Sequence, residues 1–277
     1  MIKRVLLIDG SSLIYRCFHS ISAKNADTSP ERFKENFFSL FSFQVRKWLS
    51  LNRYGFGAVL FDIDRKSFRT EILSSYKQDR PPMPKELLDW FPEILSKARE
   101  IGINPIFAPK GYEADDLIGT ISKQLAKADF RVDIVTSDRD LLQLVDYLIS
   151  VIRIKSSFNL EINNHMNFSE LNEGLLPFQI PLFKALSGDS SDNYSGIPSI
   201  GPKNAMKLIK DYPTKERLVS SLNQLQEGKI KKSLQENIKD LDKFLQLATI
   251  QTEIKFKYSL SDLALSSENN SRTGQSN

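Results

Sequence analysis

The sequence predicts an α/β fold, with a mainly parallel central sheet and helices on both of its faces. Short apolar runs of strand length alternate along the chain with longer segments in which apolar residues recur at helical spacing. Several of the short runs end at an aspartate, which is typical of parallel strands whose carboxyl ends deliver ligands to one edge of a sheet. An apolar fraction of 40% in 277 residues is ample for the core that such a fold needs.

The predicted strands are short runs dominated by apolar side chains, and they cover residues 4–8, 58–61, 104–107, 132–136 and 147–152. The first run stops at Asp9 and the second at Asp62, while Asp138 and Asp140 follow the fourth. Runs of this kind predict strands that are buried on both faces, as in a parallel sheet. The acidic residues behind them are therefore expected to meet at one edge of the sheet.

Helices are predicted from apolar periodicity over residues 30–51 and 85–101, and from Glu113 to about Leu125. Another should follow the first strand, with Ser11 or Ser12 as its N-cap. Beyond residue 152 the pattern is helical to about Ile250, with breaks at Pro177, Gly188, Gly201 and Pro213.

These elements divide the chain into three parts. Residues 1–176 are expected to form an α/β core, and this core includes an insertion at residues 65–95. Residues 177–262 should form a helical region. Residues 263–277 are expected to be a disordered tail, because beyond Leu265 the chain is rich in Ser and Asn and has no apolar residue to anchor it.

Acidic residues are unusually concentrated in Gly111-Tyr112-Glu113-Ala114-Asp115-Asp116, at the start of a predicted helix. One explanation is that carboxylates favour the positive end of a helix dipole. The same chain, however, places further acids behind strands and in loops. The candidate set is Asp9, Asp62, Glu113, Asp115, Asp116, Asp138, Asp140, Asp189 and Asp192.

Nine carboxylates without a histidine or cysteine among them indicate hard divalent cations such as Mg²⁺ or Mn²⁺ rather than zinc. Two such ions can activate water and hold both oxygens of a phosphodiester displacement. Apart from the nine acids, the chain has 38 basic against 25 acidic residues, which suits a polyanionic partner. The single cysteine, Cys17, excludes an internal disulfide and fits a reducing compartment. With no signal peptide or membrane span in the sequence, we expect a cytoplasmic protein that acts as a monomer.

Two segments have the character of phosphate-binding surfaces. Residues 65–84 interleave basic and aromatic side chains, which suits single-stranded nucleic acid, although a solvated insertion would have a similar composition. The Gly/Pro turn at residues 196–203 leads into a helix and can present backbone N–H groups to a phosphate, although a plain interhelical turn is the commoner case.

Taken together, these motifs resemble those of the bacterial 5′-3′ exonucleases of the flap endonuclease family, which includes the N-terminal nuclease domain of DNA polymerase I and the phage 5′ nucleases. The resemblance runs from about Arg4 to Ile250. It rests on Leu7-Ile8-Asp9-Gly10 with Tyr15-Arg16, Phe61-Asp62, Phe68-Arg69, Tyr76-Lys77-Gln78-Asp79-Arg80, Gly111 to Asp116, Thr136 to Leu141, Gly188 to Asn193 and Gly196 to Ala205.

The resemblance implies two metal clusters, with Asp115 lying between them. The first comprises Asp9, Asp62, Glu113, Asp115 and Asp116, and the second comprises Asp138, Asp140, Asp189 and Asp192. Lys77 and Arg80 are implied to be catalytic, on a helical arch at residues 65–95. A helix-three-turn-helix around residues 196–205 is implied to grip duplex DNA, often around a K⁺ ion. The implied DNA-binding residues are Arg16, Arg69, Tyr76, Lys77, Arg80, Gly196, Ile197, Ser199, Ile200, Gly201 and Lys203.

The implied activity is two-metal-ion hydrolysis of DNA, and of RNA primers, near 5′ ends in replication and repair, beside a DNA polymerase and a ligase. Two residues depart from the family pattern: Ser199 replaces a glycine, which puts the K⁺ site in question, and Asp79 weakens the positive field of the arch. Two other interpretations remain at this point. Asp62 and Asp64 resemble the nucleophile strand of haloacid-dehalogenase-type phosphatases, and a non-catalytic DNA-binding accessory protein would share the basic surface.

Overall fold

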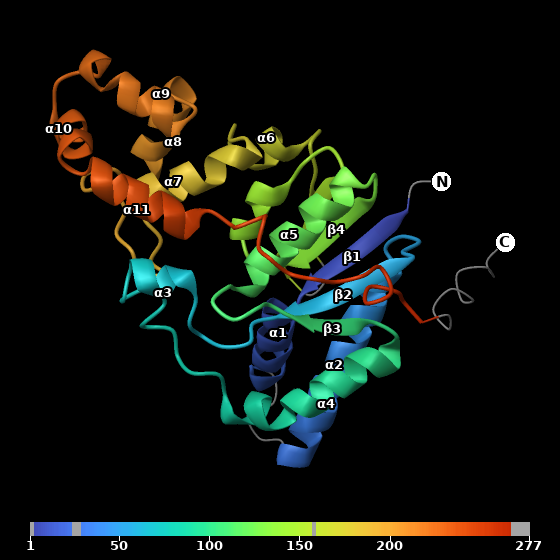
Figure 1. Cartoon of the computed structure of the whole chain (residues 1–277). Helices are drawn as coiled ribbons and strands as arrows, with labels where there is room; N and C mark the ends of the chain where they lie inside the picture. The colour runs from blue at the N-terminus through green and yellow to red at the C-terminus, as the bar shows by residue number, and fades with distance from the viewer. Residues whose placement is uncertain (1–2, 24–28, 157–158, 267–277) are drawn as a thin grey trace.

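A computed structural model describes residues 3–23, 29–156 and 159–266 of the chain (Figure 1). Its centre is a single sheet of six strands in the order β3-β2-β1-β4-β5-β6. The strands are β1 (Arg4–Asp9), β2 (Phe56–Phe61), β3 (Asn104–Phe107), β4 (Arg131–Thr136), β5 (Ile149–Ile154) and β6 (Leu160–Asn163). All neighbouring pairs are parallel except β5 with β6, which are antiparallel. The predicted α/β fold is confirmed, whereas β6 was not predicted.

Helices cover both faces of this sheet, because successive side chains of each strand point to opposite faces. In β1, Leu6 and Ile8 pack into one apolar cluster with α1 (Gly10–Ser22), α2 (Pro30–Leu49) and α4 (Lys85–Ile101). Val5 and Leu7 pack into the other cluster with α5 (Ala114–Lys127) and most of the C-terminal helices. Within the described ranges, no helix is both long and apolar enough to cross a membrane.

The helical region is gathered at one end of the sheet, on the side of α5 (Figure 1). It comprises α7 (Ile180–Ser187), α8 (Pro202–Asp211), α9 (Lys215–Ser220), α10 (Lys229–Glu236) and α11 (Ile238–Ala248), preceded by the short α6 (Phe168–Leu171). Three short 3₁₀ helices complete the description: η1 (Asp140–Leu144), η2 (Pro177–Gln179) and η3 (Leu222–Gln224). Tyr194, between α7 and α8, stacks on Phe244 of α11 with ring centroids 5.3 Å apart, which joins the two ends of this region.

The insertion at residues 65–95 is not a continuous helical arch. It contains α3 (Phe68–Ile72) and the start of α4, and residues 73–84 between them form turns and extended chain. The presence of Pro81, Pro82 and Pro84 accounts for this, because proline removes backbone donors and disfavours helix in the residue before it.

The expectation of a disordered tail from residue 263 is wrong for its first four residues. Leu263 is fully buried, and its carbonyl accepts a hydrogen bond of 2.7 Å from the backbone N–H of Gly57 in β2. The backbone N–H of Ser266 donates to Gly102. The rest of the predicted tail, residues 267–277, lies outside the described residues.

The order of the strands fixes where a site can form. The connections run outward from β1 in one direction to β2 and β3, and from β4 in the other direction to β5 and β6. A crevice opens where this order reverses, outside the carboxyl ends of β1 and β4. Asp9 and Thr136 end these two strands.

Candidate active site

A cavity of about 1960 Å³ lies at the carboxyl ends of β1, β2 and β4. Seven of the nine predicted metal ligands line it: Asp9, Asp62, Glu113, Asp115, Asp138, Asp140 and Asp189. Asp192 lies next to two of these lining residues: one carboxylate oxygen each of Asp140, Asp189 and Asp192 lies within 4.8 Å of the other two. The prediction that acids behind separate strands meet at one edge of the sheet is confirmed for Asp9, Asp62, Asp138 and Asp140.

Asp9 is held rigidly at the end of β1. One carboxylate oxygen accepts the backbone N–H of Ser12 at 2.9 Å, so that Asp9, not Ser11 or Ser12, caps α1. The other oxygen accepts the hydroxyl of Thr136 at 2.7 Å, across the crevice between β1 and β4. Burial raises the pKa of Asp9 to about 7, and the negative charges of Asp138 and Asp62 add to the rise. The protein therefore keeps this carboxylate in place at an electrostatic cost.

Asp62 links the end of β2 to the start of α5. Its Oδ1 accepts the backbone N–H of Ala114 at 2.7 Å, and its Oδ2 accepts the hydroxyl of Ser11 at 2.9 Å. An N–H at the first turn of a helix has no partner within the helix, so a carboxylate is a favourable acceptor there. These bonds fix the start of α5 over the carboxyl end of the sheet.

Glu113 precedes the first turn of α5 and is surrounded by donors. Its carboxylate accepts the ammonium of Lys77 at 2.6 Å and the hydroxyl of Ser67 at 2.8 Å, and the guanidinium of Arg69 lies 3.8 Å away. Burial alone would raise the pKa of Glu113, but the cations of Lys77 and Arg69 outweigh it and hold the pKa below its usual value. Glu113 is therefore ionised when the site is assembled.

Asp115 and Asp116 are neighbours in the sequence but differ in their surroundings. Asp115 lines the cavity, and no hydrogen bond to its carboxylate is found among the described residues. Burial, with the charges of Asp138 and Asp9, raises the pKa of Asp115 well above its usual value. Asp116 is fully buried outside the cavity and pairs with Arg69. Of these two aspartates, Asp115 is the one that lines the predicted metal site without a hydrogen-bond partner among the described residues.

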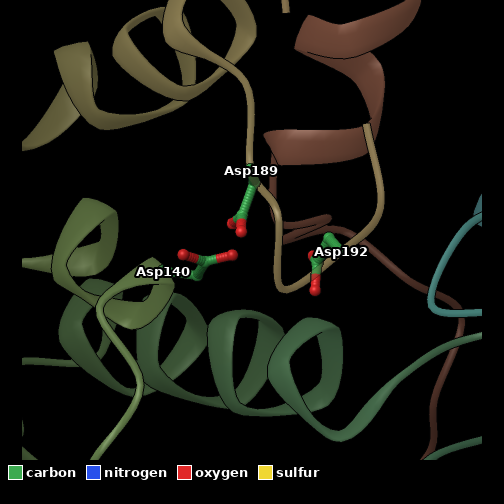
Figure 2. Close-up of side chains that lie close together, drawn as sticks. All are labelled: Asp140, Asp189 and Asp192. Atoms are coloured by element: carbon green, nitrogen blue, oxygen red, sulfur yellow. The ribbon is translucent and has the colours of Figure 1, made fainter. Parts of the chain in front are cut away.

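The tightest acidic group consists of Asp140, Asp189 and Asp192, which approach one another from different segments (Figure 2). Asp140 begins η1 after β4, whereas Asp189 and Asp192 lie in the loop that follows α7. Asp138 supports this arrangement because its Oδ1 accepts the backbone N–H of Asp140 at 2.9 Å. Burial raises the pKa of Asp140 to about 7, with a further contribution from the charge of Asp138.

Lys184 was not predicted, yet it forms ion pairs with both Asp140 and Asp189. Burial opposes ionisation of Asp189, but the charge of Lys184 and hydrogen bonds from Lys184 and Ser191 hold its pKa below the usual value. The sequence did contain a signal, since Lys184 is the one charged residue in the otherwise apolar helix Ile180–Ser187. A lone cation in an apolar helix beside an acidic loop is expected to have a buried partner.

The turn-rich segment after α3 docks against the same acidic loop. The hydroxyl of Tyr76 and the guanidinium of Arg80 donate to the two oxygens of Asp192, at 3.0 and 2.7 Å. The backbone N–H of Lys77 donates to the carbonyl of Asp192 at 3.1 Å, and Lys77 has a φ of 54°. Left-handed backbone is uncommon for lysine, so these contacts hold Lys77 in a strained conformation beside the cavity.

The predicted DNA-binding residues differ in how they lie relative to the cavity. Arg16, Tyr76, Lys77, Arg80 and Lys203 line it, whereas Arg69 does not. Arg69 and Tyr76 are only 3% and 5% exposed, and their polar groups are bonded to acidic residues. The expectation that Arg69 contacts DNA directly is therefore corrected, because Arg69 is buried and does not line the cavity. The contact expected of Tyr76 stays a prediction.

The predicted turn lies between α7 and α8. Gly196 has a φ of 68°, and a Cβ there would lie 2.2 Å from the backbone nitrogen of Gly188, so only glycine fits. Ile197 and Ile200 are buried and can offer only backbone groups to a ligand, whereas Gly201 and Lys203 are exposed at the start of α8. Ser199 keeps a left-handed φ of 67°, the conformation that a glycine would adopt.

The chemistry of the donor set fits hard divalent cations. The acids at the cavity offer only carboxylate oxygens, the ligands that Mg²⁺ and Mn²⁺ prefer. The raised pKa values of Asp9, Asp115 and Asp140 reflect mutual repulsion and burial that a cation would relieve.

Comparison with known proteins decides the family. The model of the 5′-3′ exonuclease N-terminal resolvase-like domain matches residues 4–172, and that of the 5′-3′ exonuclease C-terminal SAM fold matches residues 175–271. The chain belongs to the 5′-3′ exonuclease family. As a 5′-3′ exonuclease, it is a hydrolase of phosphodiester bonds.

Curated relatives agree with this assignment, and a solved structure shares the fold. The 5′-3′ exonuclease of Mycoplasma pneumoniae is 35% identical over 271 residues, with 95% of this chain and 90% of the relative covered. DNA polymerase I of Bacillus caldotenax is 33% identical over 97% of this chain but only 30% of the polymerase. The bacteriophage T5 flap endonuclease, solved as a complex with DNA and metal ions, shares the fold with a TM-score of 0.72, at 22% identity and with 90% of each chain covered.

The match overturns both competing interpretations of the sequence. A phosphatase built on Asp62 and Asp64 is excluded by the family, and Asp64 is exposed and bonded to the backbone N–H of Lys66 at 2.8 Å. A non-catalytic DNA-binding accessory protein is excluded because the family is enzymatic.

Proposed function

We propose that this exonuclease cleaves DNA near 5′ ends, removing 5′ flaps and RNA primers during replication and repair, with two or more Mg²⁺ or Mn²⁺ ions as cofactors. The observation that carries the proposal is the convergence of Asp140, Asp189 and Asp192 within 4.8 Å beside a cavity lined by further acids and by Lys77 and Arg80. Close carboxylates with cations beside them suit a reacting phosphate.

The residues that would hold the ions are the acids that line the cavity, together with Asp192 beside it: Asp9, Asp62, Glu113, Asp115, Asp138, Asp140, Asp189 and Asp192. When bound, the ions would supply charge to activate water and to stabilise the leaving oxygen.

Lys77 and Arg80 are proposed to orient the scissile phosphate. Both line the cavity, and both are anchored by carboxylates, Lys77 by Glu113 at 2.6 Å and Arg80 by Asp192 at 2.7 Å. A cation held in place by a neighbouring acid loses little freedom when it meets a phosphate. Because Glu113 and Asp192 belong to the acidic set, these ion pairs also fix the two cations relative to the proposed metal ligands.

The turn at residues 196–203 is proposed to hold the duplex part of the substrate. Its exposed backbone leads into α8, whose first N–H groups have no intrahelical partners. The left-handed φ of Ser199 supports a turn geometry that a K⁺ ion could also use, because the serine occupies the conformation of a glycine.

We further expect the enzyme to act as a monomer in the cytoplasm, associated with the nucleoid. Removal of a flap or primer leaves a gap or nick, so a polymerase that fills and a ligase that seals are the expected partners.

A flap-cleavage assay tests the proposal. A duplex with a labelled 5′ flap should be cut near the flap junction in Mg²⁺ or Mn²⁺, and cleavage should stop in EDTA. Asp140→Asn should reduce the rate by about a thousandfold, whereas Lys97→Met, which removes an exposed ion pair with Glu100, should not change it. Full cleavage in excess EDTA would contradict the metal-dependent mechanism.

A further inference from the structure

Behind the cavity wall, Arg69 of α3 and Asp116 of α5 form a buried ion pair. Two parallel hydrogen bonds of 2.8 Å join the guanidinium to the two carboxylate oxygens. The side chains are 3% and 0% exposed, so neither reaches the cavity or the solvent. A bidentate pair of this kind is among the stronger and more directional contacts in proteins.

The acceptor positions of Asp116 are fully used. Besides the two bonds from Arg69, Oδ2 accepts the backbone N–H of Glu113 at 3.0 Å and Oδ1 accepts the backbone N–H of Gln251 at 2.9 Å. A carboxylate has about four lone-pair sites, so these four donors leave none for a cation. In this respect Asp116 is unlike its neighbour Asp115, which lines the cavity.

Arg69 also donates hydrogen bonds to the C-terminal end of α11. Its Nε donates to the carbonyl of Leu247 at 2.8 Å, and its Nη2 donates to the carbonyl of Thr249 at 3.0 Å. The last carbonyls of a helix have no intrahelical partner and carry partial negative charge, so a guanidinium satisfies them well. One ion pair thus joins the start of α5 to the end of α11.

A second contact clamps the same end of α11 to the α/β half. Gln143 of η1 donates to the carbonyl of Ala248 at 3.0 Å and accepts the backbone N–H of Ile250 at 2.9 Å. The element η1 begins with Asp140. The end of α11 is therefore tied to two of the segments that bring acids from the α/β half, the start of α5 and η1.

We propose that Asp116 is a positioning residue and not a metal ligand: with Arg69 it locks the helical region, which carries Asp189 and Asp192, against the start of α5, which carries Asp115. The inference rests on the proposed function, because it assigns the pair a task in assembling that site. It predicts opposite behaviour for two adjacent aspartates of one helix.

The experiment compares Asp115→Asn with Asp116→Asn, using Mn²⁺ as the probe in calorimetric titrations and thermal unfolding in EDTA. Asp116→Asn should lower Tm by about 10 °C, because it leaves the charge of Arg69 buried without a partner, and should weaken Mn²⁺ binding by less than about threefold. Asp115→Asn should leave Tm unchanged or raised, and should weaken Mn²⁺ binding about tenfold or more. The reverse pattern, with Mn²⁺ binding lost in Asp116→Asn and Tm intact, would overturn the proposal.

Arg69→Lys keeps the charge but not the bidentate fork, and it provides the readout if Asp116→Asn does not fold. At 20 °C, well below unfolding, Arg69→Lys should slow single-turnover cleavage about tenfold or more, with KM for the flap duplex and Mn²⁺ affinity within about threefold of wild type. A lowered Tm with an unchanged cleavage rate would mean that the pair is only structural, and would refute the positioning role.

The double variant Arg69→Met/Asp116→Asn tests whether the two residues act as a unit. Its loss in Tm should be smaller than the sum of the losses in Arg69→Met and Asp116→Asn, because each single change already breaks the same pair. Additive losses would contradict the coupling. Tm and Mn²⁺ affinity are measured without DNA, so failure of flap cleavage would count against the proposed function and leave this inference standing.

Discussion

Removing the positive charge of Lys184 offers a direct test of the electrostatics at the acidic group. The ammonium forms ion pairs with Asp140 and Asp189, and the three side chains are only 9–16% exposed. Lys184→Met would leave these carboxylates close to Asp192 with their main counter-charge gone. Breaking a buried ion pair on one side costs about 3 kcal/mol, which corresponds to a Tm lower by roughly 9 °C in EDTA for a chain of this size.

The second half of this prediction concerns the stability of Lys184→Met in the presence of a divalent ion. If Mg²⁺ supplies the missing charge, the loss in Lys184→Met should shrink to about 1 kcal/mol or less in millimolar Mg²⁺. Lys123→Met is the matched control, since Lys123 pairs with Asp146 at 2.8 Å with both side chains substantially exposed, and such a pair contributes at most about 1 kcal/mol in either buffer. Differential scanning calorimetry gives both numbers. Equal destabilisation of Lys184→Met in EDTA and in Mg²⁺ would refute the assignment of this group as a cation site.

Three further predictions follow from the same geometry. Lys77→Ala should slow single-turnover cleavage at saturating DNA about a hundredfold while changing DNA affinity little. Arg80→Ala should slow cleavage less, because the Arg80 side chain is more exposed. Cleavage rates equal to wild type would exclude both residues from phosphate orientation. Ser199→Gly should stabilise the protein by about 1 kcal/mol in urea unfolding, because it relieves a positive φ. Asp9 and Asp140 have folded-state pKa values raised from 3.8 to about 7, so the folded state binds protons more tightly than the unfolded chain. Stability in metal-free buffer should therefore be highest near pH 4 and fall as the pH rises to about 7, and Asp9→Asn should flatten that slope.

The sequence was informative where the signal was local. Asp9 and Asp62 follow apolar runs of strand length, and parallel strands bring their carboxyl ends together whatever the details of packing. The same reasoning predicted where Asp138 and Asp140 would lie. Edge strand β6 escaped prediction because Leu160–Asn163 is short and half polar, which is typical of a strand at the border of a sheet.

The roles of Asp115 and Asp116 could not be distinguished from the sequence. Both residues stand in the first turn of the same helix, and only burial and partners separate them. The partner of Asp116 is Arg69, 47 positions earlier, and Gln251 lies 135 positions later. Contacts at such separations depend on how helices pack, which no local pattern encodes. For the same reason, the sequence predicted that Arg69 contacts DNA, whereas its side chain lies in the interior.

The three aspartates of Figure 2 come from both halves of the chain, Asp140 from the α/β half and Asp189 and Asp192 from the helical region. An ion bound by all three has its full affinity only while the two halves are docked, so its binding free energy opposes sub-global opening between them. Amide hydrogen exchange in α7 and α11 should then slow as Mg²⁺ is added, even where no amide touches the ion. Cofactor supply would thus govern how long the nuclease stays assembled, in addition to its rate of hydrolysis.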